Sequence, residues 1–123
     1  MCPDQFEGLR PPSASERDLL QRLLAVDFQG ANALSEQLEN TLVEPIDRDG
    51  SLRLRPVDAT PVSVSQRIPV EATYADADGV MVHVLIHVIE GVLNELEVYR
   101  EDSGDVLLAP TDAPQLEVEP WVE

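Results

Sequence analysis

Apolar residues recur at helical spacing near the start of the chain. The segment 13–16 has the pattern of a capping box, in which Ser13 and Glu16 cap the first turn of a helix reciprocally. Leucines then share one helical face up to about residue 27, at positions Leu19, Leu20, Leu23 and Leu24. Gly30 interrupts this pattern, and further apolar spacing predicts a second, shorter helix to about residue 40. The first third of the chain therefore predicts a helical hairpin.

From residue 42 onward the apolar period changes to two, which indicates β-strands. We expect short strands at 42–46 and 51–55, and Pro45 favours an edge position for the first. Three longer strands follow at 62–74, 80–89 and 92–100, the first of them bent near Pro69. Short turns separate them, which favours antiparallel pairing. The pattern predicts an α+β fold, with the N-terminal helical hairpin packed on one face of a roughly five-stranded antiparallel sheet.

The two faces of the strand at 80–89 differ in character. One face is unbroken and apolar and is assigned to the core; it consists of Val82, Val84, Ile86 and Val88. The other presents His83, Leu85, His87 and Ile89. Because half of this second face is apolar, we expect the helices or a partner to cover it in part.

Both ends of the chain have the composition of loose segments. We expect a flexible N-terminal arm at 1–12, a single α+β domain at 13–108, and an acidic, proline-containing C-terminal tail at 109–123. A tail is favoured over 109–123 because termini are loose unless something ties them down. The alternation in 116–122 leaves a short final strand as the alternative.

The chain is strongly acidic, with a net charge of −16. Residues 1–60 hold eleven acids and six arginines (net −5), whereas residues 61–123 hold thirteen acids and two arginines (net −11). Such a surface repels phosphate backbones and attracts basic proteins, so we expect no nucleic-acid partner and a basic protein as the candidate partner. The simpler interpretation is that the acid only keeps the protein soluble.

Cofactor, metal and membrane signals are lacking in the sequence. Cys2 is the only cysteine, and the two D-x-D-G segments at 47–50 and 76–79 lack the other ligands of a calcium loop, so we read them as turns. We expect neither a metal nor another cofactor. The first residues do not resemble a secretory signal, and no apolar run reaches the length of a membrane span, which predicts a cytoplasmic protein without a membrane partner.

The candidate site residues lie on the last two long strands or just after them. His83 and His87 share one strand face roughly 13 Å apart, at about 3.3 Å per residue, which is too far for a single metal ion without other ligands. Together with neighbouring residues they form the predicted binding set of His83, Leu85, His87, Glu95, Glu97, Tyr99 and Asp102. No nucleophile–base pair accompanies them, so we name no catalytic residue and favour a non-enzymatic role.

The segment DADGVMVHVLIHVIEGVLNELEVYREDSG, together with RDLLQRLLAVDFQGANALSEQL, resembles a family of small uncharacterised bacterial domains that is frequent in actinobacteria. The shared pattern is an H-V strand, a D/E-G turn and a strand ending in L-x-E-L-E-V-Y-R-x-D-x-G, over about residues 17–104. The resemblance implies the α+β fold. It implies no activity, and a cysteine-rich turn in some relatives has no counterpart at 46–50 here.

Two functional hypotheses follow. The first is a protein-interaction module, for example an immunity-like or antitoxin-like inhibitor whose acidic face masks a basic partner. The second is a small-ligand binder or enzyme, with a pocket between helices and sheet near His83, His87 and Tyr99. A homodimer through a sheet edge or an apolar face is a further prediction.

Overall fold

The computed structural model describes residues 8–121, and most of the predicted arm, with Cys2, lies outside them. Its elements are, in chain order, α1 (Ala14–Leu24), α2 (Ala31–Leu38), β1 (Thr41–Pro45), β2 (Leu52–Pro56), β3 (Val70–Ala75), β4 (Met81–Ile89), β5 (Val92–Arg100), the 3-10 turn η2 (Pro110–Asp112) and β6 (Glu117–Pro120). The strands form one sheet in the order β1-β2-β5-β4-β3-β6, and every neighbouring pair is antiparallel. The predicted α+β class is confirmed.

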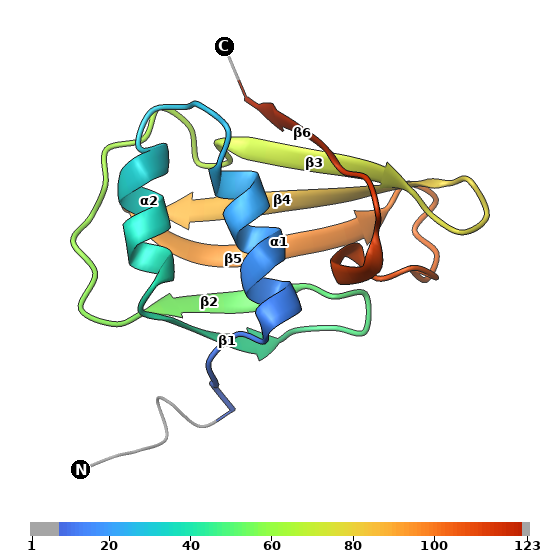
Figure 1. The fold of residues 1–123 in the computed structure, drawn as a ribbon, viewed down its shortest axis with the longest axis horizontal. Coiled ribbons are helices and arrows are strands. Elements are labelled where there is room, and N and C mark those ends of the chain that lie inside the picture. The colour runs from blue at the N-terminus through green and yellow to red at the C-terminus, as the bar shows by residue number, and fades with distance from the viewer. Residues whose placement is uncertain (1–7, 122–123) are drawn as a thin grey trace.

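The two helices lie on the same face of the sheet (Figure 1). The predicted capping box starts α1: the Glu16 N–H donates to Ser13 Oγ at 3.2 Å, and the Ser13 N–H donates to Glu16 Oε1 at 2.8 Å. The leucine face of α1 is buried against the sheet, where Val82, Val84 and Ile86 have no exposed surface. The predicted helical hairpin and the predicted core face of β4 are therefore both confirmed.

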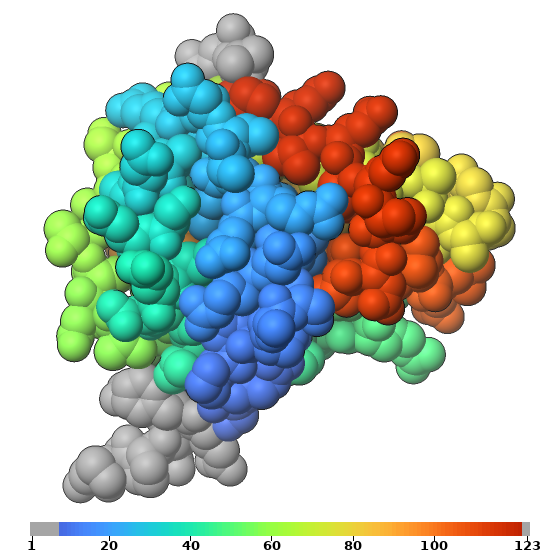
Figure 2. All heavy atoms as spheres, in the orientation of Figure 1, coloured from blue at the N-terminus to red at the C-terminus, as the bar shows by residue number. Residues whose placement is uncertain are grey.

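The prediction of five strands is wrong, because β6 forms a sixth. It lies in the segment 109–123, where the sequence favours a tail over a short final strand. β6 pairs with the free edge of β3, and Val118 packs against the core between two outward-facing glutamates. The free backbone groups of β3 and the apolar contact of Val118 hold the segment 117–120 in place, although its composition is typical of a loose tail. With η2 beside α1, the C-terminal segment completes the layer that covers the helix side (Figure 2).

The first long strand is shorter than predicted. It begins at Val70, after Pro69, instead of near residue 62. Proline has no N–H for a ladder hydrogen bond, which agrees with a start after it. The preceding segment instead crosses the end of the β4–β5 hairpin, where the Val62 N–H donates to the Gly91 carbonyl at 2.8 Å.

At the N-terminus, part of the predicted arm pairs with the sheet. The Arg10 N–H donates to the Val43 carbonyl at 2.9 Å, and the Val43 N–H donates back at 2.7 Å. This bridge lies along β1, which is the edge strand that Pro45 predicted. One sheet edge is therefore partly covered by the chain itself.

Candidate functional site

Residues on the side of the sheet opposite the helices form an acidic surface, here called the open face. It consists of the outward side chains of β3 to β6 and of Glu101 after β5. Register places Glu71 of β3 beside Glu119 of β6 and Leu85 of β4, and Glu97 of β5 on the far side of Leu85. No lysine or arginine extends from these four strands onto this face, since the guanidinium of Arg100 lies at the strand end among aspartates. The open face is therefore the most one-sidedly charged surface of the sheet.

His83 of β4 contacts three other residues of the open face. Its Nδ1 lies 2.5 Å from Glu71 Oε2, and its Nε2 lies 2.7 Å from Glu101 Oε1. Its ring also stacks on Tyr99, with ring centroids 5.0 Å apart and an interplanar angle of 10°. His83 thus connects β3 to the end of β5 across the strand that carries it.

Burial and the neighbouring glutamates shift the pKa values of His83 and Tyr99. Burial lowers the pKa of His83, but the hydrogen bonds to Glu71 and Glu101 outweigh burial, and the net shift is upward. Burial raises the pKa of Tyr99, and the surrounding glutamates raise it further. The cluster therefore favours a protonated imidazole and a neutral phenol.

Of the predicted site residues, Leu85 is not available for contact. It retains 5% of its surface although it lies on the open face. In register it sits between Glu71 and Glu97, whose aliphatic stems can shield it while their carboxylates reach water. His87 lies beside it, with Nε2 2.8 Å from Glu97 Oε1. The expected half-apolar surface is therefore a layer of histidine and glutamate side chains over a buried leucine.

Glu95 and Tyr99 both lie on the open face, and for Glu95 the strand pattern predicted an exposed position. Glu95 is in register with His87 on β4 and with Arg53 on β2, at the border of the acidic surface. Tyr99 keeps 41% of its surface exposed. His83, His87, Glu95, Glu97 and Tyr99 are thus brought together on one surface.

Asp102 belongs to a different cluster, built around Arg100. The Arg100 guanidinium donates to Asp102 at 2.8 and 3.0 Å, to Asp78 at 2.6 and 3.0 Å, and to buried Asp76 at 3.0 Å. Asp76 also accepts the N–H groups of Leu107 and Leu108 at 2.9 and 2.7 Å. Burial raises the pKa of Asp76, but these donors outweigh burial and lower it to about 2. The cluster ties the segment after β5 to the sheet, so Asp102 has a structural role.

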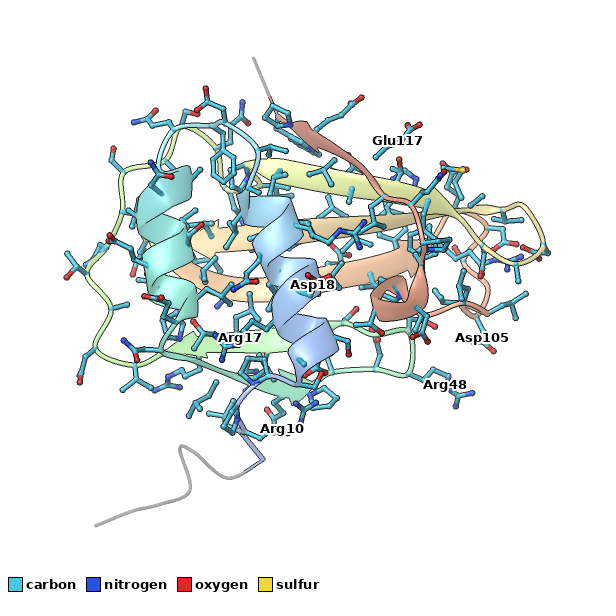
Figure 3. The ribbon with its side chains drawn as sticks, in the orientation of Figure 1. Arg10, Arg17, Asp18, Arg48, Asp105 and Glu117 are labelled. Carbon is cyan, nitrogen blue, oxygen red and sulfur yellow. The ribbon has the colours of Figure 1, made fainter. Side chains whose placement is uncertain are left out.

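The binding set predicted from the sequence omits several residues of the open face. Glu71, Glu101, Glu117 and Glu119 lie there, as does Trp121, whose Nε1–H donates to Glu71 Oε1 at 3.2 Å. Glu117 is on the edge strand β6 (Figure 3). Alternation in β3 and β6 was the available signal, but which strand pairs with which depends on topology that the sequence does not state.

The hypothesis of a pocket between helices and sheet near His83, His87 and Tyr99 disagrees with the structure. These residues lie on the opposite face, and the space between helices and sheet is filled by the core. A hollow of about 480 Å³ lies between α2 and the loop 57–63 and is lined by none of them. In the part of the chain that the structure describes, no group of three or more histidine, cysteine or acidic residues could hold a metal ion. None of the helices in residues 8–121 has the length and apolar character that crossing a membrane requires.

Comparison with known proteins identifies only the family. Searches of curated proteins and of solved structures found no significant match. A family model matches residues 9–110, which include the helices, β1 to β5 and the whole Arg100 cluster, whereas β6 and Trp121 lie beyond it. The expected kinship to an uncharacterised family is confirmed, over a somewhat longer stretch than the resemblance suggested. The chain belongs to the family described as "Domain of unknown function (DUF6984)".

Proposed function

We propose that the chain is a non-enzymatic interaction domain whose open face binds a basic protein, as an immunity-like or antitoxin-like inhibitor would. The observation that carries the proposal is the one-sided charge of that face. Six glutamates, at positions 71, 95, 97, 101, 117 and 119, lie on or beside four adjacent strands that offer no arginine or lysine to solvent there. Complementary charge speeds association and selects partners more than it adds raw affinity.

Exposed aromatic rings give the face anchors that charge alone would not provide. Tyr99 and Trp121 each keep 41% of their surface exposed. Both lie among carboxylates, since Trp121 donates to Glu71 and Tyr99 stacks on the histidine between Glu71 and Glu101. An aromatic ring flanked by carboxylates suits the guanidinium of a partner arginine, through cation–π contact and charge together.

The face is also pre-organised. His83 fixes the positions of Glu71 and Glu101, and His87 fixes that of Glu97, before any partner arrives. Side chains that are already ordered lose less conformational entropy on binding. An ordered, acidic surface of this kind suits the basic surface of a protein such as a nuclease or toxin.

The expected homodimer is less well supported by the same surface. Two open faces would bring like charges together, which costs free energy. The β6 edge carries Glu117, Glu119 and Pro120, which are typical of edges that resist pairing with another strand. The partner that charge favours is therefore a different, basic chain.

The experiment compares capture by three immobilised proteins from host lysate at low and at high salt. The face variant carries Glu95→Gln, Glu117→Gln and Glu119→Gln. The matched control loses the same charge on the helix side, through Asp18→Asn, Glu36→Gln and Glu39→Gln, all of them exposed residues. We expect the wild type and the control to retain the same basic protein at low salt and release it at high salt, and the face variant to lose it. Equal retention by the face variant, or no retained basic protein, would contradict the proposal.

A further inference from the structure

The two carboxylate contacts of His83 require more protons than a neutral histidine has. A neutral imidazole carries one N–H, and its other nitrogen has a lone pair. In the structure both ring nitrogens face carboxylate oxygens, at 2.5 Å from Glu71 and 2.7 Å from Glu101. A lone pair at that distance from a carboxylate oxygen is repulsive, so the group Glu71–His83–Glu101 holds a second proton.

The surroundings of His83 favour the imidazolium as the holder of that proton. From β3 it faces Glu71, and from β5 it faces Tyr99 and Glu101, with Glu97 one position further along the same face. From β6, Glu117 lies beyond Thr73, which is the register partner of His83 on β3. No arginine or lysine stands among these groups, and the stacked Tyr99 ring adds a favourable cation–π contact. The raised pKa of His83 agrees with this geometry.

We propose that His83 is an internal cation that competes with a basic partner for Glu71 and Glu101, so that binding to the open face releases one proton. This inference rests on the proposed function of the face. When an arginine or lysine of the partner reaches the two carboxylates, its charge replaces that of the imidazolium. His83 gives its second proton to solvent and keeps one N–H, and the partner's cation is not consumed.

Glu101 is the carboxylate at which a partner cation can replace the imidazolium of His83. Its side chain is 53% exposed, whereas those of Glu71 and His83 are 24% and 18% exposed. A partner can therefore approach Glu101 from solvent without moving the strand. Because the bound state holds fewer protons than the free state, affinity should rise with pH, by at most about tenfold per pH unit for one proton.

His87 provides an internal control for this mechanism. It lies 2.8 Å from one carboxylate, that of Glu97, through Nε2 alone. A neutral tautomer with its proton on Nε2 satisfies that contact completely. Replacing His87 should therefore leave the proton linkage intact, whereas replacing His83 should remove it.

The test measures calorimetric affinity for nona-arginine at constant low salt, from about pH 5.5 to about pH 8.5. We expect the affinity of the wild type and of His87→Gln to rise several-fold with pH, and that of His83→Gln to vary little and to exceed the wild type at low pH. Wild-type binding without this rise, or a rise that persists in His83→Gln, would overturn the inference while leaving the proposed function standing. Failure of all three proteins to bind at any pH would overturn the proposed function and the competition with it.

A second measurement reads the proton without relying on affinity. Nitrogen-15 NMR distinguishes an imidazolium from a neutral imidazole in the folded full chain. We expect His83 to be doubly protonated at pH 6 and to lose one proton when nona-arginine is added at about pH 7. A neutral His83 at pH 6, or a bound peptide that leaves its protonation unchanged, would overturn the inference.

Discussion

Replacing Gly91 with alanine should destabilise the fold far more than the same change at Gly79. Both glycines have positive φ angles: φ is +79° at Gly91 and +91° at Gly79. This backbone conformation costs an L-residue about 1–2 kcal/mol. A Cβ at Gly79 meets nothing within 4 Å, so the conformational cost is the whole effect there. A Cβ at Gly91 would lie 2.6 Å from both the N and the O of Val62. The chain at Val62 must therefore move.

That movement breaks hydrogen bonds as well. The Val62 N–H donates to the Gly91 carbonyl at 2.8 Å, and two residues earlier the Thr60 carbonyl accepts Gln37 Nε2 at 3.0 Å. At about 1 kcal/mol for each lost bond, the total for Gly91→Ala is about 3–4 kcal/mol, against about 1–2 kcal/mol for Gly79→Ala. Urea unfolding followed by circular dichroism and by the fluorescence of Trp121, the single tryptophan, gives both values. Equal free energies of unfolding for the two variants would refute the packing of Val62 on the β4–β5 turn.

Four further predictions concern the helix cap, ion pairs and the pH dependence of stability. Ser13→Ala should lower the free energy of unfolding by about 1 kcal/mol in chemical denaturation, because it removes the cap of α1. The hydrogen bond from Arg10 lowers the pKa of Glu16 to about 2. The stability that Glu16 contributes is therefore present above pH 4.5 and is lost as the pH falls toward 2. In acid unfolding, Glu16→Gln should lack this loss of stability between pH 4.5 and pH 2. Arg100→Gln should lower Tm and speed hydrogen exchange at residues 106–108, whereas Arg48→Gln on the exposed β1–β2 turn (Figure 3) should leave both unchanged. The raised pKa of His83 means that its contribution is full below pH 6.5 and is lost as pH rises through the raised value, so the Tm of the wild type should fall relative to that of His83→Gln above pH 6.5.

Local patterns predicted most of the fold because each reports on its own segment. The capping box at Ser13 and the alternation of β4 concern neighbours in sequence, and both are confirmed. The β6 strand was harder to predict, because its formation depends on the free edge of β3, whose paired residues lie 44 to 50 positions earlier in the sequence. Proline-rich composition is the same in a tail and in a short edge strand, so only pairing distinguishes them.

The site was predictable in part for the same reason. The outward positions of β4 and β5 follow from alternation, and the structure places His83, His87, Glu97 and Tyr99 on one face. Glu71 comes from β3, and Trp121 follows β6, so their proximity to His83 needs the strand order β5-β4-β3-β6. Asp102 is close in sequence to the residues of the open face, which is why the predicted set includes it. The chain turns after Arg100, however, and the Arg100 guanidinium donates hydrogen bonds to the Asp102 carboxylate.

The most direct test of the acidic open face is NMR mapping of the nitrogen-15-labelled chain with nona-arginine at low salt. We predict shifts that saturate at Glu97, Tyr99, Glu101 and Glu119, that spare the outward sides of α1 and α2, and that vanish at high salt. Shifts spread equally over helices and sheet would show attraction to net charge alone, without a defined face. That outcome, or the absence of any shift, would contradict the account.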